Sequence, residues 1–193
     1  MFKALSPEVR TLLFADNIWY FGEGLFGPLL AVFAERVGGD VLDITWAWAI
    51  YLITTGTLAI FIGRLSDRYD KRKLMVAGYF LNAVMTFSYL FVHDSFGLFV
   101  VQIGLGIATA LATPTWDALL DQYSGDGKVD GVVWGMADGS AQIVTGIAIF
   151  CGGLLVTFTS FTFLFIVMGI IQTLAALLQT RILFMKSTKR ARA

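Results

Sequence analysis

GRLSDRYDKRK, residues 63–73, carries seven charged side chains in eleven residues. It lies between two long apolar stretches that are almost free of charge. Soluble folds rarely isolate such a charged cluster between two apolar runs of helix length. In a membrane protein, the same pattern is typical of a short cytoplasmic turn between two spanning helices.

The composition of the whole chain agrees with this interpretation. Hydrophobic residues make up 57% of the 193 residues and charged residues 15%, and the mean hydropathy is +0.75. A soluble domain carries about 25% charged residues, so the composition indicates a membrane protein with several spans. The single cysteine, Cys151, lies in an apolar run and is expected to be a core residue.

The sequence offers no chemistry of catalysis. It contains no phosphate-binding loop, no paired cysteines and no cluster of histidines, and no nucleophile lies in a recognisable pattern with a base. We therefore predict that the chain is not an enzyme and that it uses no cofactor and no metal ion.

The apolar stretches predict the number of spanning helices. A spanning helix needs about 20 mostly apolar residues. Six stretches meet this requirement, at residues 9–34, 44–64, 73–92, 96–120, 131–156 and 161–184. The sequence thus predicts an all-α integral membrane protein. We expect one six-helix transmembrane domain over residues 1–193, with a basic cytoplasmic tail at 185–193.

The distribution of positive charge predicts the orientation. If the N-terminus is cytoplasmic, the N-terminal segment, the 63–73 turn, Lys128 and the tail together place 13 of the 14 Lys and Arg residues in the cytoplasm. Only Arg36 then lies outside. We expect both termini to be cytoplasmic and the protein to reside in the inner (cytoplasmic) membrane of a cell.

The charged turn also resembles a family signature. In the major facilitator superfamily, the loop between the second and third helices follows a pattern close to G-x-L-[A/S]-D-R-x-G-[R/K]-[R/K]-[R/K]. Gly63, Asp67, Arg68 and the basic residues 71–73 match it. Asp70 stands where the family has Gly, although Asp tolerates the backbone angles of a tight turn better than most residues.

The fourth predicted span resembles the same family. Gly104-Leu105-Gly106 is followed by Ala112-Thr113-Pro114 and by Leu120-Asp121, as in the family's fourth helix and its exit. The arginine that often precedes the first of these glycines by four residues is replaced by Val100. The Gly-Pro pair of drug/proton antiporters is replaced by Ala148-Ile149, so this resemblance does not extend to that subclass.

The resemblance covers the whole chain but half of the family's usual plan. Members have twelve spans in two six-helix halves, related by an axis along the membrane normal. The resemblance implies that this chain is one such half, built from 3+3 inverted repeats, and that a second copy completes it as a homodimer. The alternative is that it is the N-terminal half of a longer transporter.

Polar residues inside the predicted spans are the candidate binding residues. An ionisable side chain at mid-membrane costs at least about 2.5–3.5 kcal/mol, so it is expected to face a cavity or a partner. The resemblance implies that the first, fourth and fifth spans line or approach the cavity. The candidates for substrate or proton binding are Asp16, Asn17, Tyr20, Glu23, Gln102, Thr109, Trp116, Asp138 and Gln142.

We expect Glu23, near the middle of its span, to carry the coupling proton, with Asp16 or Asp138 assisting. The alternatives are ordinary ones: hydrogen bonds between helices for the carboxylates, backbone hydrogen bonds for Thr109, and a place in the interfacial aromatic belt for Trp116. Asn82 and Gln172 lie on the third and sixth spans, which the resemblance places outermost. We expect both of these amides to be packing residues.

Two further groups follow from the resemblance. A cytoplasmic gate is expected, in which Asp67 bonds a helix N-terminus of the other half and basic residues pair with carboxylates of the fourth helix. Its members are Gly63, Asp67, Arg68, Lys71, Arg72, Asp117 and Asp121. The alternative role for the basic residues is to orient the protein in the membrane by their positive charge.

A dimer seam is expected at Gly131, Gly135 and Gly139, whose spacing lets helices approach closely. Packing within one subunit is the alternative.

Together these observations predict a secondary active transporter. It would move a small cationic or neutral solute by alternating access, as a homodimer coupled to protons. Its partners would be a second copy of itself, the lipid bilayer, a small-molecule substrate and protons, with no nucleic acid. A non-transporting membrane partner or regulatory protein on the same scaffold is the alternative function.

Overall fold

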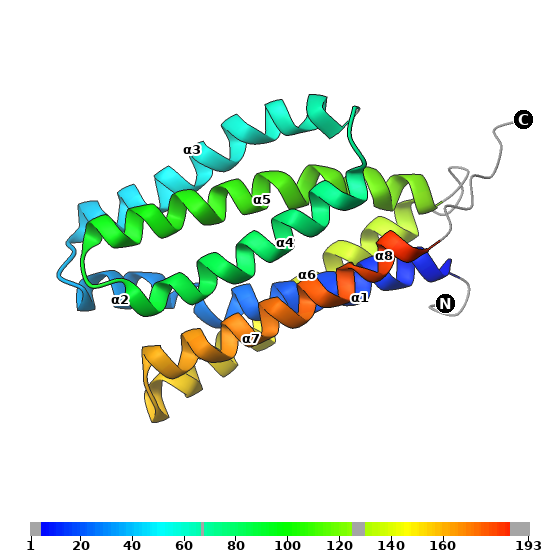
Figure 1. The fold of residues 1–193 in the computed structure, drawn as a ribbon. Helices are drawn as coiled ribbons and strands as arrows, with labels where there is room; N and C mark the ends of the chain where they lie inside the picture. The colour runs from blue at the N-terminus through cyan, green and yellow to red at the C-terminus, as the bar shows by residue number, and fades with distance from the viewer. Residues whose placement is uncertain (1–4, 67, 125–129, 186–193) are drawn as a thin grey trace, which may run out of the picture.

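The computed structural model describes residues 5–66, 68–124 and 130–185. The described residues form helices and no strand (Figure 1). The elements are α1 (Pro7–Phe26), α2 (Leu29–Arg36), α3 (Val41–Ser66), α4 (Lys71–Ser88), the short 3₁₀ helix η2 (Tyr89–Phe91), α5 (Ser95–Ser124), α6 (Asp130–Phe158), α7 (Phe161–Gln179) and α8 (Arg181–Phe184). The prediction of an all-α chain is confirmed.

Five segments of the described chain are long and apolar enough to cross a membrane. They are α3, α4 with η2, α5, α6 from Gly131, and α7 with α8. Each overlaps one of the apolar stretches found in the sequence. α1 is not among them, because its 20 residues include Glu8, Arg10, Asp16 and Glu23. That α1 forms a sixth span therefore stays a prediction.

The first apolar stretch, residues 9–34, differs from the single helix expected there. α1 ends at Phe26 and α2 begins at Leu29, with Gly27 and Pro28 between them. Proline has no N–H to donate, and its ring clashes with the carbonyl group four residues earlier in a continuous helix. Hydropathy alone does not register this break.

The helices follow one another around the protomer in the order α3, α5, α4, α7, α1 and α6. α4 packs against both α5 and α7, and α1 packs against both α7 and α6. α3 packs mainly against α5, and α6 packs mainly against α1. α3 and α6 therefore stand at the two edges, and we refer to them as the edge helices.

The edge helices bury little of their surface within the protomer. In the apolar stretch of α3, 6% of the residues are buried, and in that of α6, 17%. The corresponding shares in α4, α5 and α7 are 44% or more. Both edge helices thus present faces that nothing in the described chain covers.

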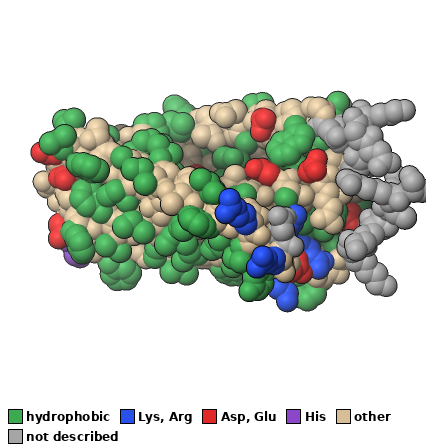
Figure 2. Space-filling model, turned by 90° about the horizontal axis from the view of Figure 1, so that it is seen from above, with side chains coloured by type: hydrophobic (Ala, Val, Ile, Leu, Met, Phe, Trp, Pro, Cys, Tyr) green, Lys and Arg blue, Asp and Glu red, His purple; other side chains and the backbone are tan. Residues whose placement is uncertain are grey.

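Basic side chains are unevenly distributed along the molecule. Figure 2 shows hydrophobic side chains over much of one face, with Lys and Arg gathered toward one end. In Figure 1, α1 begins, α8 ends and the α3–α4 turn lies at the same end. This clustering of basic residues at one end is the pattern of a protein oriented in a membrane by positive charge.

Candidate functional site

Four helices meet around a small cavity, to which α1, α5 and α6 contribute carboxylates. The cavity has a volume of about 70 Å³ and is lined by Asp16 of α1, Asp117 of α5 and Asp138 of α6. Five aromatic side chains also line it: Trp19, Tyr20, Tyr79, Trp116 and Trp134. We call this cavity the carboxylate pocket. Its described lining contains no Lys, Arg or His, so its electrostatic potential favours cations.

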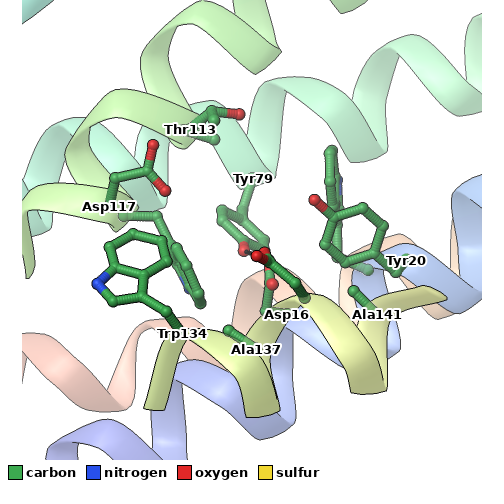
Figure 3. Close-up of a pocket in the computed structure, with 12 residues that line it drawn as sticks. Asp16, Tyr20, Tyr79, Thr113, Asp117, Trp134, Ala137 and Ala141 are labelled. Atoms are coloured by element: carbon green, nitrogen blue, oxygen red, sulfur yellow. Dashed lines mark hydrogen bonds between the residues drawn. The ribbon is translucent and has the colours of Figure 1, made fainter. Parts of the chain in front are cut away.

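Asp16 is held in the pocket by a tyrosine from α4. The Tyr79 hydroxyl donates a hydrogen bond of 2.7 Å to Asp16 Oδ1. Tyr79 itself is buried in the apolar core between α1 and α4. Figure 3 shows the two side chains pointing toward one another beside Tyr20. The carboxylate of Asp16 therefore has a fixed position at the wall of the pocket.

Aromatic rings form the rest of the wall. Trp116 of α5 meets Trp134 of α6 edge to face, with 6.3 Å between the ring centroids. Trp19 meets Tyr20 in the same way at 5.0 Å. Faces of such rings attract organic cations, with Trp the strongest. The pocket therefore combines negative charge with aromatic surface.

The volume of the pocket limits what one protomer can hold. Sites for drug-sized ligands measure about 300–1,000 Å³, several times the size of this cavity. A protomer alone has space here for a few water molecules or a small ion. A larger solute needs walls beyond those that this cavity provides.

Glu23 does not line the carboxylate pocket. Its Oε1 accepts hydrogen bonds from Asn82 Nδ2 of α4 and from Gln172 Nε2 of α7, each of 3.0 Å. The sequence suggested packing roles for these two amides, and in the structure they hold the carboxylate of Glu23. Asp16 lies seven residues before Glu23, so the two carboxylates are about 10 Å apart along α1.

Four other predicted residues also lie outside the lining of the pocket. Asn17 Nδ2 donates a hydrogen bond of 3.0 Å to Ser140 Oγ and so joins α1 to α6. Thr109 Oγ1 lies 3.2 Å from the Tyr51 hydroxyl and joins α5 to α3. Gln102 is buried within the protomer, and Gln142 is exposed on α6.

Comparison with known proteins gives the family. The family model of the Major Facilitator Superfamily matches residues 12–193, nearly the whole chain. The chain belongs to the Major Facilitator Superfamily. Membership makes it a multi-pass membrane protein, and because members of this family are transporters, the prediction that it is not an enzyme is confirmed.

Individual members of the superfamily match it at low identity. An uncharacterised MFS-type transporter of Methanocaldococcus jannaschii, MJ1560, is 28% identical over 90% of this chain. The chain spans less than half of that relative, 45% of its length. YitZ of Bacillus subtilis, also an uncharacterised MFS-type transporter, is 20% identical over 84% of this chain, and the match covers 98% of YitZ. The multidrug resistance protein MdtG of Escherichia fergusonii is 22% identical over 69% of this chain and 34% of its own length.

The signature turn of this superfamily member is built around Asp70. Asp70 Oδ1 accepts a hydrogen bond of 3.0 Å from the backbone N–H of Arg72 and so caps α4. The Arg72 guanidinium donates to both carboxylate oxygens, at 3.1 and 2.9 Å. These bonds hold the pKa of Asp70 below its ordinary value. Asp70 has a negative φ of −64°, so this turn does not need the glycine that the family pattern has here.

The expected gate residues lie in different surroundings. Arg72 is bound by Asp70, whereas Asp117 lines the pocket and Asp121 is exposed. Arg68 is exposed, and Gly63 lies near the end of α3, where its carbonyl accepts a hydrogen bond of 2.8 Å from Ser66 Oγ. Asp67 lies outside the described residues. Lys71 is half-buried at the start of α4.

The seam glycines lie on an open face of α6. A Cβ atom built on Gly131, Gly135 or Gly139 would meet nothing within 4 Å. The same holds for Gly146 and Gly153 of α6. No packing within the described protomer therefore explains these glycines.

Proposed function

We propose that the chain is a half-size secondary transporter of the Major Facilitator Superfamily that moves small cationic or neutral organic solutes by alternating access. In this proposal it spans the membrane six times with both termini cytoplasmic, and a second copy completes the central cavity. The carboxylate pocket is the observation that carries it. Three carboxylates and five aromatic rings without a basic residue make a surface suited to an organic cation.

The size of the pocket supports the need for a second half. The carboxylate pocket of one copy has a volume of about 70 Å³, and the two edge helices bury little of their surface within that copy. The match to YitZ, which covers nearly all of that protein, supports the existence of family members of this size. The match to MJ1560, which covers less than half of that protein, supports the alternative of a longer chain.

The glycines support a contact between copies at the edge helices. Glycines inside α1, α4 and α7 have neighbours within about 3 Å of a built Cβ, and they serve packing within the protomer. The described helical glycines with nothing within 4 Å all lie on the edge helices: Gly56, Gly63, Gly131, Gly135, Gly139, Gly146 and Gly153. Small residues on a helix face permit close approach of another helix in a membrane.

The charge of the pocket and the relatives together support a substrate class. An anion would be repelled by Asp16, Asp117 and Asp138, whereas an organic cation is attracted by the carboxylates and by the ring faces. Two relatives are named a multidrug resistance protein and an efflux pump. We therefore propose that the solutes include organic cations and that proton movement drives their transport, with Glu23 as the proton carrier.

Transport of a fluorescent organic cation, such as ethidium, by purified protein in vesicles with an imposed pH gradient tests this function. We expect Asp16→Asn and Asp138→Asn each to weaken the apparent affinity about tenfold or more, because each removes a charged contact worth about 1.5–3 kcal/mol. Glu35→Gln is the matched control, since Glu35 is exposed on α2, away from the pocket.

Two results would contradict the proposal. Equal transport by the wild type and both pocket variants would remove the pocket from the route of the solute. Absence of gradient-driven movement for cationic and neutral solutes alike would favour a non-transporting partner or regulatory protein.

A further inference from the structure

Glu23 lies in a polar layer of its own, separate from the carboxylate pocket. The layer joins three helices, because Glu23 of α1 accepts hydrogen bonds from Asn82 of α4 and Gln172 of α7. Asp16, two helical turns earlier on α1, lines the pocket and accepts its hydrogen bond from Tyr79. α1 thus carries two carboxylates with different partners and different surroundings.

Gln172 is the member of this layer whose hydrogen bonding is incomplete. Its side chain is fully buried. Its Nε2 donates to the Trp19 carbonyl oxygen at 3.2 Å as well as to Glu23, but its Oε1 has no hydrogen-bond partner. Asn82 differs, because its Oδ1 accepts a hydrogen bond of 3.2 Å from Thr86 Oγ1. A buried acceptor without a donor is destabilising. The layer therefore lacks one hydrogen-bond donor, for Gln172 Oε1.

A proton bound to Glu23 supplies the missing hydrogen. A carboxylic acid and a carboxamide can pair through two hydrogen bonds, one from the amide N–H to the acid carbonyl and one from the acid O–H to the amide carbonyl. The first already joins Gln172 Nε2 to Glu23 Oε1 at 3.0 Å. The second requires the unpaired Gln172 Oε1 to face the other oxygen of Glu23.

No cation competes for the carboxylate. In the described part of the chain, no Lys, Arg or His forms an ion pair with Glu23. The titratable groups that face it are the phenols of Tyr51 on α3 and Tyr89 in η2. α4 and α7 present the two amides, and the carboxylates Asp117 of α5 and Asp138 of α6 lie at the pocket instead.

Asn82 and Gln172 are buried, at 2% and 0% exposure. The two amides therefore hold the Glu23 carboxyl from within the packed core between α1, α4 and α7.

We propose that Glu23 and Gln172 form a proton-binding site distinct from the substrate pocket, in which the protonated Glu23 carboxyl pairs with the Gln172 carboxamide. One O–H bond forms on Glu23 when the proton binds and breaks when it leaves, and no other covalent bond changes. Gln172 is a positioning residue that acts through Glu23. The proposal rests on the proposed proton coupling, and it ties proton loading to the contact between α1 and α7.

Infrared spectroscopy of the reconstituted full chain, titrated with pH, tests this pairing directly. We expect a carboxylic acid C=O stretching band that is absent in Glu23→Gln. In Gln172→Met this band should shift to higher frequency, because the acid has lost both hydrogen bonds to the amide. Gln179→Met is the matched control. Gln179 is a second fully buried glutamine, about two helical turns after Gln172 on α7, and its replacement should leave the band in place.

Three results decide the proposal. If no carboxylic acid band is lost in Glu23→Gln, or if the band has the same frequency in Gln172→Met as in the wild type, the proposal is overturned. If Gln172→Met does not fold, wild-type protein with isotope-labelled glutamine replaces it. A glutamine carbonyl band must then shift with pH in the wild type and stay fixed in Glu23→Gln, and absence of that shift overturns the proposal. These spectra need no transported solute, so the proton site can stand even if the proposed transport function fails.

Discussion

At the scale of single residues, the bond between Tyr79 and Asp16 makes a measurable prediction. Tyr79→Phe keeps the buried ring but removes the donor to Asp16 Oδ1. A hydrogen bond to a charged group is worth about 1.5–3 kcal/mol, so we expect a lower melting temperature in detergent, by about 2–4 °C for each kcal/mol lost. Tyr69→Phe is the control, because Tyr69 is 62% exposed. Equal melting of both variants would show that the bond contributes nothing to stability.

Two neighbouring glycines of α6 give a second residue-scale prediction. A Cβ on Gly152 would collide with the backbone carbonyl of Leu25 on α1, whereas a Cβ on Gly153 would meet nothing within 4 Å. Overfilling a packed contact costs about 1–3 kcal/mol, and Ala in place of Gly gains up to about 1 kcal/mol of helix propensity. We expect Gly152→Ala to lower the melting temperature strongly, and Gly153→Ala, whose methyl group meets nothing within the described chain, to change it less. The reverse order would contradict the packing of α6 on α1.

The sequence indicated part of the site at this scale. Asp16, Tyr20, Trp116 and Asp138 were among the candidates on the spans that the resemblance places at the cavity, and these four line the pocket. Trp134 was missed, because the sequence alone does not show whether an aromatic residue in an apolar span faces a cavity or the lipid. The partners of Glu23 were missed because periodicity along one helix does not say which residue of another helix it meets.

At the scale of elements, Asp70 makes a prediction about the start of α4. Asp70→Ala removes the cap, which is worth about 0.5–2 kcal/mol, together with the bonds to the Arg72 guanidinium. Asp70→Asn keeps an oxygen for the cap and should retain most of the stability. Thermal unfolding in detergent measures both, and equal loss in the two variants would show that the charge, not the cap, matters.

The same turn predicts a dependence on pH. Hydrogen bonds from Arg72 lower the pKa of Asp70 from its ordinary 3.8, so the folded state binds the proton less readily than the unfolded state. The stabilisation is therefore complete above about pH 4 and is lost as the pH falls through the lowered pKa. Its size is small, because the pair is partly exposed. Melting curves of the wild type and Asp70→Asn should converge in this acid range, and a constant difference would contradict the assignment.

The sequence predicts the elements better than their breaks. Runs of apolar residues locate α3, α4, α5, α6 and α7, because a bilayer demands long apolar helices. Hydropathy predicts one continuous helix over α1 and α2, because it ignores the backbone geometry that Pro28 imposes. The 63–73 turn is recognised by its charges, yet the capping role of Asp70 depends on backbone angles that the family pattern does not contain.

At the scale of the whole molecule, the resemblance placed a dimer seam on the glycines of the fifth span, whereas hydropathy alone could not say which helices stand at the edges. Mean hydropathy is similar for buried and lipid-facing helices, and only the contacts between helices show that α3 and α6 are each packed on one side. Glycines on a membrane helix permit the close approach of another helix, whereas a face that meets only lipid makes no such contact. The open glycines on both edge helices, together with the small volume of the carboxylate pocket, therefore favour a protein surface there.

The arrangement of the edge helices yields a cross-linking prediction for the assembly. α3 and α6 run in opposite directions through the protomer (Figure 1). The distance along α3 from its first residue to Gly63 is about the same as the distance along α6 from Gly135 to its last residue. Gly63 and Gly135 therefore lie at a similar depth in the membrane when α3 of one copy packs against α6 of another. In a background with Cys151→Ser, differently tagged copies carrying Gly63→Cys or Gly135→Cys should form a disulfide-linked pair in membranes. Copies carrying Val84→Cys or Leu174→Cys, on the exposed faces of α4 and α7, should stay separate. Absence of the first product, with both variants folded and inserted, would rule out this homodimer and favour a second half supplied by another chain.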